Sequence, residues 1–428
     1  MKILLMTNTY RPYTGGVQRS IDAFTEKFEQ KGHDVLIIAP RSDDDSQEDD
    51  EGVYRVSAIK NFNDTNFPVS IPLPGAITAK LEEFQPEIVH SHFPFIIGST
   101  AMRVAASFDI PLVFTYHTMY EKYIHYISSD SDRVREFVKK LTTGYSNLCN
   151  LVIAPSLAVK DILIRRGVEV PIKVIPTGID NKFFLKSELN QVREKFDLDK
   201  ECFVVGHVGR LASEKNLDYL TKSVSLFLKK NRDSRFMIVG DGPLAESMKN
   251  FFLNQNLSSQ VLFTGVLKGQ ELIEAYQAMD LFVFASKTET QGMVLAEAMA
   301  SSLPVIAIKA TGVTDILKDG CNGYMLDKED VEEFADKIDK CMHMDRLDWT
   351  RIKENAVETA RHFSMDKCAS DVLKSYEELI AIHDPGAGRS DESVFHGVMS
   401  MVKAEWEIFC NYANAAGTLI SNDKTEPE

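Results

Sequence analysis

The sequence predicts an α/β fold with two doubly wound, Rossmann-like domains that face each other across a cleft, followed by a helical C-terminal extension. Short apolar runs of strand length alternate with stretches in which apolar residues recur at helical spacing. The alternation stops at the turn Pro176–Gly178 and then begins again. A length of 428 residues suits two or three domains. Apolar strands separated by helices are typical of parallel sheets covered by helices on both faces.

The first half begins with a strand, a polar loop that contains glycine (Thr7–Gly16) and a helix that carries Val17, Ile21 and Phe24 at helical spacing. The run Asp43–Glu51, with seven acids in nine residues, predicts a solvated loop. The expected strands are Lys2–Met6, Asp34–Ala39, Glu87–Ser91, Leu112–Tyr116, Leu151–Ala154 and Ile172–Ile175.

The second half repeats the pattern and ends in helices. Its expected strands are Phe203–His207, Arg235–Val239, Val261–Thr264, Asp280–Ala285 and Pro304–Ile308. Helices dominate from Val331 to Ile382, Asp384–Gly388 (DPGAG) indicates a linker, and an amphipathic helix is expected at Ser393–Ala415 before a disordered end. We therefore expect domains at 1–177 and 178–360, a helix at 361–382 that packs back across them, and a tail at 383–428.

Composition excludes several classes of protein. Hydrophobic residues make up 44% and charged residues 26%, which excludes disordered, collagen-like and multi-span membrane proteins. The net charge of −15 argues against a nucleic-acid partner, because phosphate binding needs a basic face. Six widely spaced cysteines without a CxxC pair indicate a reducing compartment. No apolar window of 18 residues exists, so we expect a cytoplasmic protein that can attach peripherally to a membrane.

The segment Ser286–Ala300 (SKTETQGMVLAEAMA) is the most informative part of the sequence. It follows an expected strand and opens a helix near Gly292, so the N–H groups of Gly292, Met293 and Val294 lie where a helix favours an anion. Glu289 precedes this helix and Glu297 lies within it. Two carboxylates beside a phosphate cradle can bind the hydroxyls of a sugar and of a ribose. Taken alone, the two residues are as well explained by a surface acid and a helical acid that have no role in binding.

A second set of candidates follows other strand ends, where open α/β sheets bind ligands. Arg210 and Lys215 are placed to neutralise a diphosphate without a metal, although an isolated pair of this kind is more often solvated. Gly15 and Gly16 permit close approach of a phosphate, but the GxGxxG dinucleotide pattern is absent. Further candidates of the same kind are His117, which can bind a sugar hydroxyl or a phosphate, and Asp241 in the turn GDGP, which can approach a nucleotide.

The sequence offers little evidence for a metal site. His90 and His92 share one face of a strand, but no third ligand lies at a helpful spacing. The DxD pairs Asp130/Asp132 and Asp197/Asp199 fall in polar connections and are expected to face solvent. We expect no metal and no other cofactor.

In combination, these motifs resemble the retaining GT-B glycosyltransferases of glycosyltransferase family 4. The E-x7-E pattern of Glu289 and Glu297, the R-x4-K pattern of Arg210 and Lys215, the GG loop, the GDGP turn and the PTGID linker occur in the family's order over roughly residues 1–380. A narrower resemblance, carried by Thr115–Ile127 (TYHTMYEKYIHYI) and by the segment that contains Glu289, is to bacterial 1,2-diacylglycerol 3-glucosyltransferases.

The resemblance implies a role for each residue. Glu289 and the backbone at Gly292 and Met293 would hold the donor sugar, and Glu297 would bind the ribose. Arg210 and Lys215 would bind the diphosphate of a UDP-sugar, Gly15 and Gly16 its phosphates from the opposite domain, and His117 would lie near the reacting centre. The acceptor would be diacylglycerol at the cytoplasmic membrane, and the hydroxyl would attack from the face that UDP leaves. A two-carboxylate glycosidase is rejected, because both acids are committed to binding hydroxyls. A family 4 enzyme with another glycolipid or cell-envelope acceptor, an epimerase and a catalytically silent binding protein remain the alternatives.

One stretch suggests how the protein meets a membrane. In 133–148, Phe137 belongs to an apolar stripe at helical spacing, and four cations flank the stripe against one acid, Glu136. A basic amphipathic helix of this kind lies on anionic lipid. The alternative is that the stripe packs into the N-terminal domain. The four cations are Arg133, Arg135, Lys139 and Lys140.

Overall fold

The chain folds into two compact units, which we describe from a computed structural model. One unit comprises Met1–Pro176 and Ala369–Glu428, and the other comprises Thr177–Cys368. The structure describes residues 1–12, 15–41, 51–56, 58–59, 69–70, 74–122, 132–287, 289, 291–383, 403, 407–412 and 414–415. The expected linker, most of the acidic run and most of the expected tail helix lie outside these residues.

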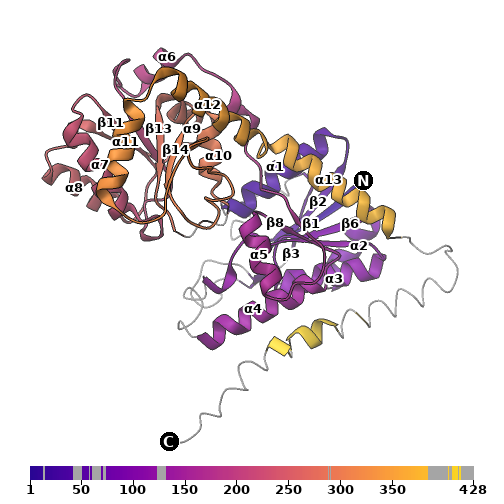
Figure 1. The fold of residues 1–428 in the computed structure, drawn as a ribbon. Coiled ribbons are helices and arrows are strands. Elements are labelled where there is room, and N and C mark those ends of the chain that lie inside the picture. The colour runs from indigo at the N-terminus through magenta and orange to yellow at the C-terminus, as the bar shows by residue number, and fades with distance from the viewer. Residues whose placement is uncertain are drawn as a thin grey trace, which may run out of the picture. The chain divides into compact units, whose positions relative to one another are not determined.

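The N-terminal unit is built on a seven-stranded sheet whose paired strands are all parallel (Figure 1). The strand order is β3-β2-β1-β6-β7-β8-β9. Its strands are β1 (Lys2–Met6), β2 (Asp34–Pro40), β3 (Val53–Val56), β6 (Ile88–Ser91), β7 (Leu112–Thr115), β8 (Leu151–Ala154) and β9 (Ile172–Val174). A short antiparallel pair is formed by β4 (Ala58–Ile59) and β5 (Val69–Ser70). The helices are α1 (Gly16–Gln30), α2 (Pro74–Phe84), α3 (Ile96–Phe108), α4 (Asp132–Asn147) and α5 (Leu157–Arg165).

The C-terminal unit repeats this architecture with a six-stranded parallel sheet in the order β12-β11-β10-β13-β14-β15. The strands are β10 (Val204–Val208), β11 (Arg235–Val239), β12 (Val261–Gly265), β13 (Leu281–Phe284), β14 (Val305–Ile308) and β15 (Gly323–Leu326). The helices are α6 (Leu189–Lys195), α7 (Leu217–Lys230), α8 (Ala245–Asn254), α9 (Gly269–Ala278), α10 (Met293–Ala300), α11 (Val331–Met342) and α12 (Arg346–Arg361).

The last long helix, α13 (Met365–Ile382), begins in the C-terminal unit and continues in the N-terminal unit. Its Tyr376 is completely buried and packs edge-on against Phe28 of α1, with 5.9 Å between the ring centroids. Lys173 of β9 donates a hydrogen bond of 3.1 Å to Ser375 Oγ. The N-terminal unit is therefore completed by residues from the far end of the chain.

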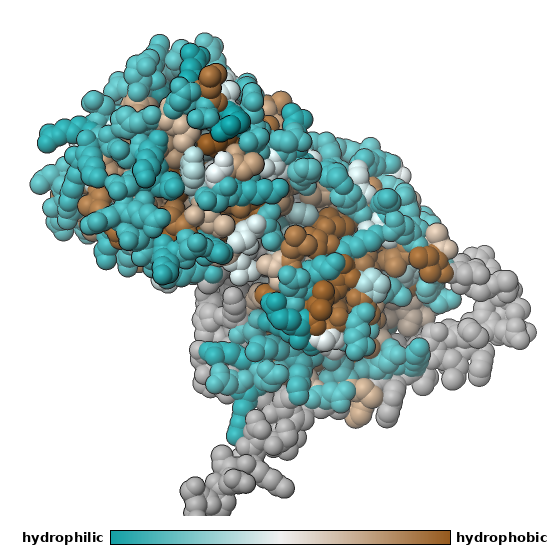
Figure 2. Space-filling view, viewed as in Figure 1, coloured by the Kyte–Doolittle hydropathy of each residue, from teal (hydrophilic) through white to brown (hydrophobic). Residues whose placement is uncertain are grey.

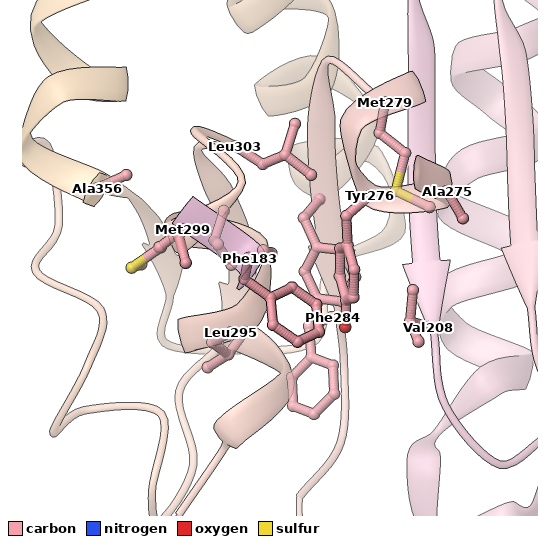
Figure 3. Close-up of a cluster of buried hydrophobic side chains, with 14 of the residues drawn as sticks. Phe183, Val208, Ala275, Tyr276, Met279, Phe284, Leu295, Met299, Leu303 and Ala356 are labelled. Carbon is pink, nitrogen blue, oxygen red and sulfur yellow. The ribbon is translucent and has the colours of Figure 1, made fainter. Parts of the chain in front are cut away.

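Both sheets are buried because their strands are apolar on both faces. The middle strands of each sheet, such as β8 (LVIA) and β13 (LFVF), have no exposed residue, as expected for parallel strands between two helical layers. In the C-terminal unit, side chains of α9, α10 and the sheet point toward one another, with Tyr276, Phe183 and Phe284 in close proximity (Figure 3).

The structure confirms the predicted fold and adds strands that local patterns did not predict. These are β3 and β15, which lie at sheet edges, and the two-residue pair β4 and β5. Residues on edge strands are only partly covered, so β3 and β15 lack the continuous apolar run that marked the central strands. No helix among the described residues is long and apolar enough to cross a membrane.

Candidate functional site

The strand order places the main candidates of the C-terminal unit beside one another. Strand β10 pairs with β11 on one side and with β13 on the other, so the strand order reverses there. Open α/β sheets bind ligands at the carboxyl ends of the strands that flank such a switch point. The loop after β10 carries Arg210 and Lys215, and the loop after β13 carries Glu289.

Backbone contacts join the loop after β10 to the GDGP turn after β11. The N–H of Leu211 donates to the carbonyl of Asp241 over 2.9 Å, and the N–H of Gly209 donates to the carbonyl of Val239 over 3.0 Å. Gly240 has φ of 135°, and a Cβ at this position would lie 1.9 Å from the carbonyl oxygen of Gly209. Glycine is therefore required for the two loops to touch. Arg210 and Asp241 both remain exposed on the joined loops.

Lys215 and Glu289 form an ion pair across the switch point. Lys215 ends a short 3₁₀ turn, and its Nζ contacts Glu289 Oε1. The Lys215 side chain is 23% exposed and the Glu289 side chain 17%, so both are shielded yet reachable from solvent. Ser286 Oγ donates a 3.3 Å hydrogen bond to the carbonyl of Glu214, which ties the two loops together. A carboxylate that can bind sugar hydroxyls thus lies beside a cation that can bind phosphate.

Neighbouring backbone fixes the loop that carries Glu289. Gly292 caps α10 in the left-handed conformation, with φ of 69°. A Cβ on Gly312 would lie 3.1 Å from the carbonyl oxygen of Glu289, so the loop packs directly on this glycine. Thr177 donates hydrogen bonds of 3.0 Å from both its N–H and its hydroxyl to Gln291 Oε1. These contacts hold Glu289 in front of the first turn of α10, which begins with Met293 and Val294.

Glu297 lies one turn into α10 and accepts a hydrogen bond of 2.8 Å from the hydroxyl of Tyr276. Tyr276 is completely buried, and burial raises its pKa, so the hydroxyl remains a donor. The tyrosine therefore orients the carboxylate. Sequence reasoning did not identify Tyr276, because its local pattern is that of an ordinary core residue of α9.

In the N-terminal unit, Gly15 and Gly16 lie at the start of α1. Gly15 is the N-cap, and a Cβ on either glycine would meet nothing within 4 Å. Packing therefore does not require glycine here, whereas approach of a ligand to the backbone would. The loop is tethered to α1 by the Tyr10 hydroxyl, which donates to Asp22 Oδ1 over 2.7 Å.

His117 belongs to a stack of three imidazoles at the carboxyl ends of β6 and β7. The rings of His90 and His92 stack with centroids 4.2 Å apart, and His92 Nδ1 lies 2.8 Å from His117 Nε2 in a hydrogen bond. His92 Nε2 is buried and has no hydrogen-bond partner among the described residues. Burial lowers the pKa of His117 to about 4 and that of His92 well below its usual value. All three rings are thus neutral at pH 7.

His90 connects this stack to α13. Its Nδ1 lies 2.5 Å from the hydroxyl of Tyr376 and its Nε2 lies 2.7 Å from Thr115 Oγ1. Burial lowers the pKa of His90 to about 3. Both ring nitrogens are thereby engaged by protein groups. Within the described part of the chain, no group of three or more His, Cys, Asp or Glu residues is arranged to hold a metal ion, and Asp130 lies outside that part.

Helix α4 carries the basic residues of the expected membrane-binding helix. Leu141 and Tyr145, in its second half, are buried, so here the apolar stripe belongs to the domain core. Phe137, in the first half, is half-buried. Arg135 pairs with Asp132 at 2.9 Å and Lys139 with Glu136 at 3.6 Å. The side chains of Arg133 and Lys140 are exposed. The helix thus packs through one half and presents a basic edge.

Comparison with known proteins agrees with the resemblance inferred from the motifs. Residues 14–183 match the family model described as Glycosyltransferase Family 4, and residues 190–361 match the one described as Glycosyl transferases group 1. The chain is 30% identical over 348 residues to the alpha-monoglucosyldiacylglycerol synthase of Acholeplasma laidlawii, a match that covers 77% of this chain and 86% of the relative. It is 29% identical over 392 residues to a GDP-mannose-dependent alpha-mannosyltransferase of Corynebacterium glutamicum, with 89% and 90% covered.

A solved structure shows the same fold. The crystal structure of Anabaena HepE in complex with UDP matches with a TM-score of 0.69 at 21% identity, covering 89% of this chain and 100% of that one. Both family models, the relative at 30% identity and the two doubly wound units lead to one assignment. The chain belongs to glycosyltransferase family 4 and is a glycosyltransferase with the GT-B fold.

Proposed function

We propose that this enzyme is a retaining glucosyltransferase that moves glucose from UDP-glucose to the hydroxyl of diacylglycerol at the cytoplasmic face of a membrane. The carrying observation is the Lys215–Glu289 pair at the switch point, in a chain 30% identical to an alpha-monoglucosyldiacylglycerol synthase. The complex of HepE with UDP, a protein of the same fold, supports a uridine nucleotide as the carrier of the sugar.

The donor is held by charges of both signs. Arg210 and Lys215 bind the diphosphate, because a guanidinium fork and an ammonium group together offset its charge. Glu289 and the N–H groups at the start of α10 bind the hexose hydroxyls, and Glu297, oriented by Tyr276, binds the ribose. Gly15 and Gly16 bind the phosphates from the N-terminal unit, and Asp241 lies in the turn after β11, whose carbonyl bonds the loop that carries Arg210.

Transfer proceeds on the face of the sugar from which UDP departs. The bond between the anomeric carbon and the phosphate oxygen breaks, and a bond to the acceptor oxygen forms. The departing phosphate oxygen takes the proton of the acceptor hydroxyl, so charge and atoms balance without an enzymic nucleophile. Arg210 and Lys215 stabilise the charge that develops on the diphosphate. His117, half-buried and neutral because desolvation lowers its pKa to about 4, is a hydrogen-bond partner for the sugar near the reacting carbon.

Membrane attachment uses two helices of the N-terminal unit. The cations of α4 attract anionic headgroups, each contributing about 1 kcal/mol near the surface. Helix α5 adds apolar side chains, since Leu157 is 58% exposed and Ile164 is 52% exposed. Figure 2 shows apolar side chains gathered where Figure 1 draws α5. Basic and apolar residues together are typical of surfaces that lie on a bilayer.

A donor-by-acceptor panel tests the reaction. UDP-glucose, UDP-galactose and GDP-mannose are each offered with diacylglycerol, with another glycolipid and without lipid, and the anomeric configuration of the product is determined. We expect an α-glucosyl product only with UDP-glucose and diacylglycerol. An epimerase would convert the UDP-sugar without lipid, and a silent binding protein would yield no product. As a control, Lys230→Ala, which removes only an exposed ion pair, should give the same products as the wild type.

Vesicle co-sedimentation tests the membrane surface. The quadruple variant Arg133→Ser, Arg135→Ser, Lys139→Ser, Lys140→Ser is expected to bind anionic vesicles more weakly than the wild type while binding UDP equally well. Binding of the wild type should weaken as salt increases. Unchanged vesicle binding by the quadruple variant would exclude this helix as the attachment site.

Mannosyl transfer from a GDP-sugar is the second candidate. The mannosyltransferase of Corynebacterium glutamicum matches 89% of this chain, a larger share than the glucosyl relative does. The base and the hexose of the donor are therefore the two features that the panel must separate.

A further inference from the structure

A pocket of about 680 Å³ lies in the N-terminal unit, lined by α4, the end of α5 and a C-terminal segment. This segment comprises the described residues 407–412, 414 and 415. In a parallel α/β sheet the covering helices run opposite to the strands, so the last residues of α5 lie at the amino edge of the sheet. The candidates of this unit, Gly15, Gly16 and His117, follow strand ends at the opposite, carboxyl edge of the same sheet. The lining includes Lys139, Lys140, Arg165, Arg166, Asn411 and Asn414.

The C-terminal segment forms one wall of the pocket through specific packing. Ile408 is 6% exposed and joins the core of the unit, and Ala415 is completely buried. Asn411 Nδ2 donates a 3.3 Å hydrogen bond to the carbonyl of Leu141. A Cβ on Gly144 would lie 1.8 Å from Asn411 Oδ1, so the segment approaches α4 at its glycine. This wall lies beyond the residues that either family model matches.

Two of the cations that line the pocket have no carboxylate partner in the described part of the chain. Arg166 is bound to Glu121 at 2.6 Å and Lys139 to Glu136 at 3.6 Å. The carboxylate of Glu407, which also lines the pocket, pairs with Lys403 at 3.8 Å. Two further lining cations, Lys140 and Arg165, are exposed and contact no carboxylate of the described part of the chain.

We propose that this pocket binds a phosphate ester. Lys140 and Arg165 supply the positive charge, and the amides of Asn411 and Asn414 supply neutral hydrogen-bond donors to the phosphate oxygens. The source of the ester is the headgroup of an anionic phospholipid, which rests on the membrane function proposed above. Phe409 of the same segment is 62% exposed beside the pocket, and aromatic side chains favour the membrane interface. The phosphate site itself follows from the pocket alone.

Cys410 reports on occupancy because it lines the pocket. Of the other cysteines only Cys321 is exposed, so a full-length chain with Cys321→Ser isolates the signal of Cys410. Saturating UDP fills the donor site, and glycerol 1-phosphate is then added as the probe while alkylation of Cys410 is followed. We expect the probe to slow alkylation. Lys140→Ser with Arg165→Ser should weaken this protection about tenfold or more, and Arg133→Ser with Arg135→Ser should leave it unchanged.

A second variant tests the wall instead of the charge. Gly144→Ala keeps every cation but places a methyl group where Asn411 lies, so protection by glycerol 1-phosphate should weaken. Circular dichroism establishes that each variant is folded. The proposal is overturned if glycerol 1-phosphate gives no protection and the Lys140/Arg165 variant binds phosphatidylglycerol vesicles as the wild type does.

Vesicles identify the source of the phosphate. Vesicles of phosphatidylcholine with phosphatidylglycerol are compared with vesicles of phosphatidylcholine with oleate at equal negative charge. Protection of Cys410 by the phosphatidylglycerol vesicles alone supports the headgroup. Protection by glycerol 1-phosphate without binding to either vesicle supports the pocket with a soluble ester and contradicts the membrane part of the proposed function. Equal binding of both vesicles without protection contradicts the pocket and leaves that function standing.

Discussion

Removing Lys215 should damage the enzyme in two ways, whereas removing Arg210 should damage it in one. Lys215 contacts Glu289 directly, and both side chains are shielded. Arg210 is exposed and contacts no carboxylate among the described residues. In the proposed site, Lys215→Met would therefore remove a cation from the diphosphate and also release the carboxylate assigned to the hexose. Arg210→Ala removes only the cation.

The size of each effect follows from the charges involved. Loss of one group that stabilises developing charge costs about 3 kcal/mol, or roughly 10²-fold in turnover. We expect this loss for Arg210→Ala and a larger one for Lys215→Met. Neighbouring groups that act together show coupling energies of about 0.5–3 kcal/mol. Lys215→Met and Glu289→Gln combined should thus cost less than the sum of the two single changes.

A double-mutant cycle measures this coupling. Turnover of UDP-glucose with diacylglycerol is determined for the two single variants, for the double variant, and for a matched cycle of Arg210→Ala with Glu289→Gln. The thermal transitions of all variants should remain near that of the wild type. Equal coupling in the two cycles would refute the role of the ion pair, and near-normal turnover of Arg210→Ala would refute the diphosphate site.

Three further predictions concern conditions and stability. Activity should survive exhaustive chelation, since the proposed site offsets the phosphate charge with side chains; complete loss that Mg²⁺ restores would contradict the site. Burial lowers the pKa of His207 to about 4 and that of His90 to about 3, while an unfolded chain binds these protons near pH 6.5. The free energy of unfolding should therefore fall as pH decreases from about 6.5 to about 4, by about 1 kcal/mol per pH unit for each imidazole, as urea titrations can measure. Asp280→Ala removes the carboxylate that lies 2.7 Å from Arg193, which is 3% exposed, and leaves this guanidinium only backbone carbonyls as partners. The change should cost about 3–5 kcal/mol, against less than about 1 kcal/mol for Asp336→Ala at an exposed ion pair.

The sequence predicts the parts of the fold that follow from local patterns. The central strands are continuous apolar runs, and α10 begins where Gly292 and the preceding polar loop indicate. Strand order is a different matter, because the adjacency of β10 and β13 depends on pairing across 70 residues or more. The motif places Lys215 and Glu289 at strand ends, and only the strand order brings them into contact.

Long-range partners could not be predicted for a related reason. Tyr276 and Tyr376 each follow the pattern of a core residue, and nothing near them in sequence indicates a bond to Glu297 or to His90. The bond between His90 and Tyr376 joins residues 286 positions apart. The spacing of His92 from His90 permits a metal ligand, but nothing near it in sequence indicates its hydrogen bond to His117. The roles inferred for the donor-site residues remain predictions that the variants above test.

The return of α13 to the N-terminal unit has a consequence for synthesis. Residues 1–176 leave the ribosome well before residues 369–382 are synthesised. His90 therefore cannot bond to Tyr376 until the whole C-terminal unit has been translated. The first unit to be made is thus the last to be finished. A fragment that ends at Pro176 would expose the surface of Phe28 that Tyr376 covers. Limited proteolysis of stalled nascent chains should show protection of this unit rising only when α13 has left the ribosome.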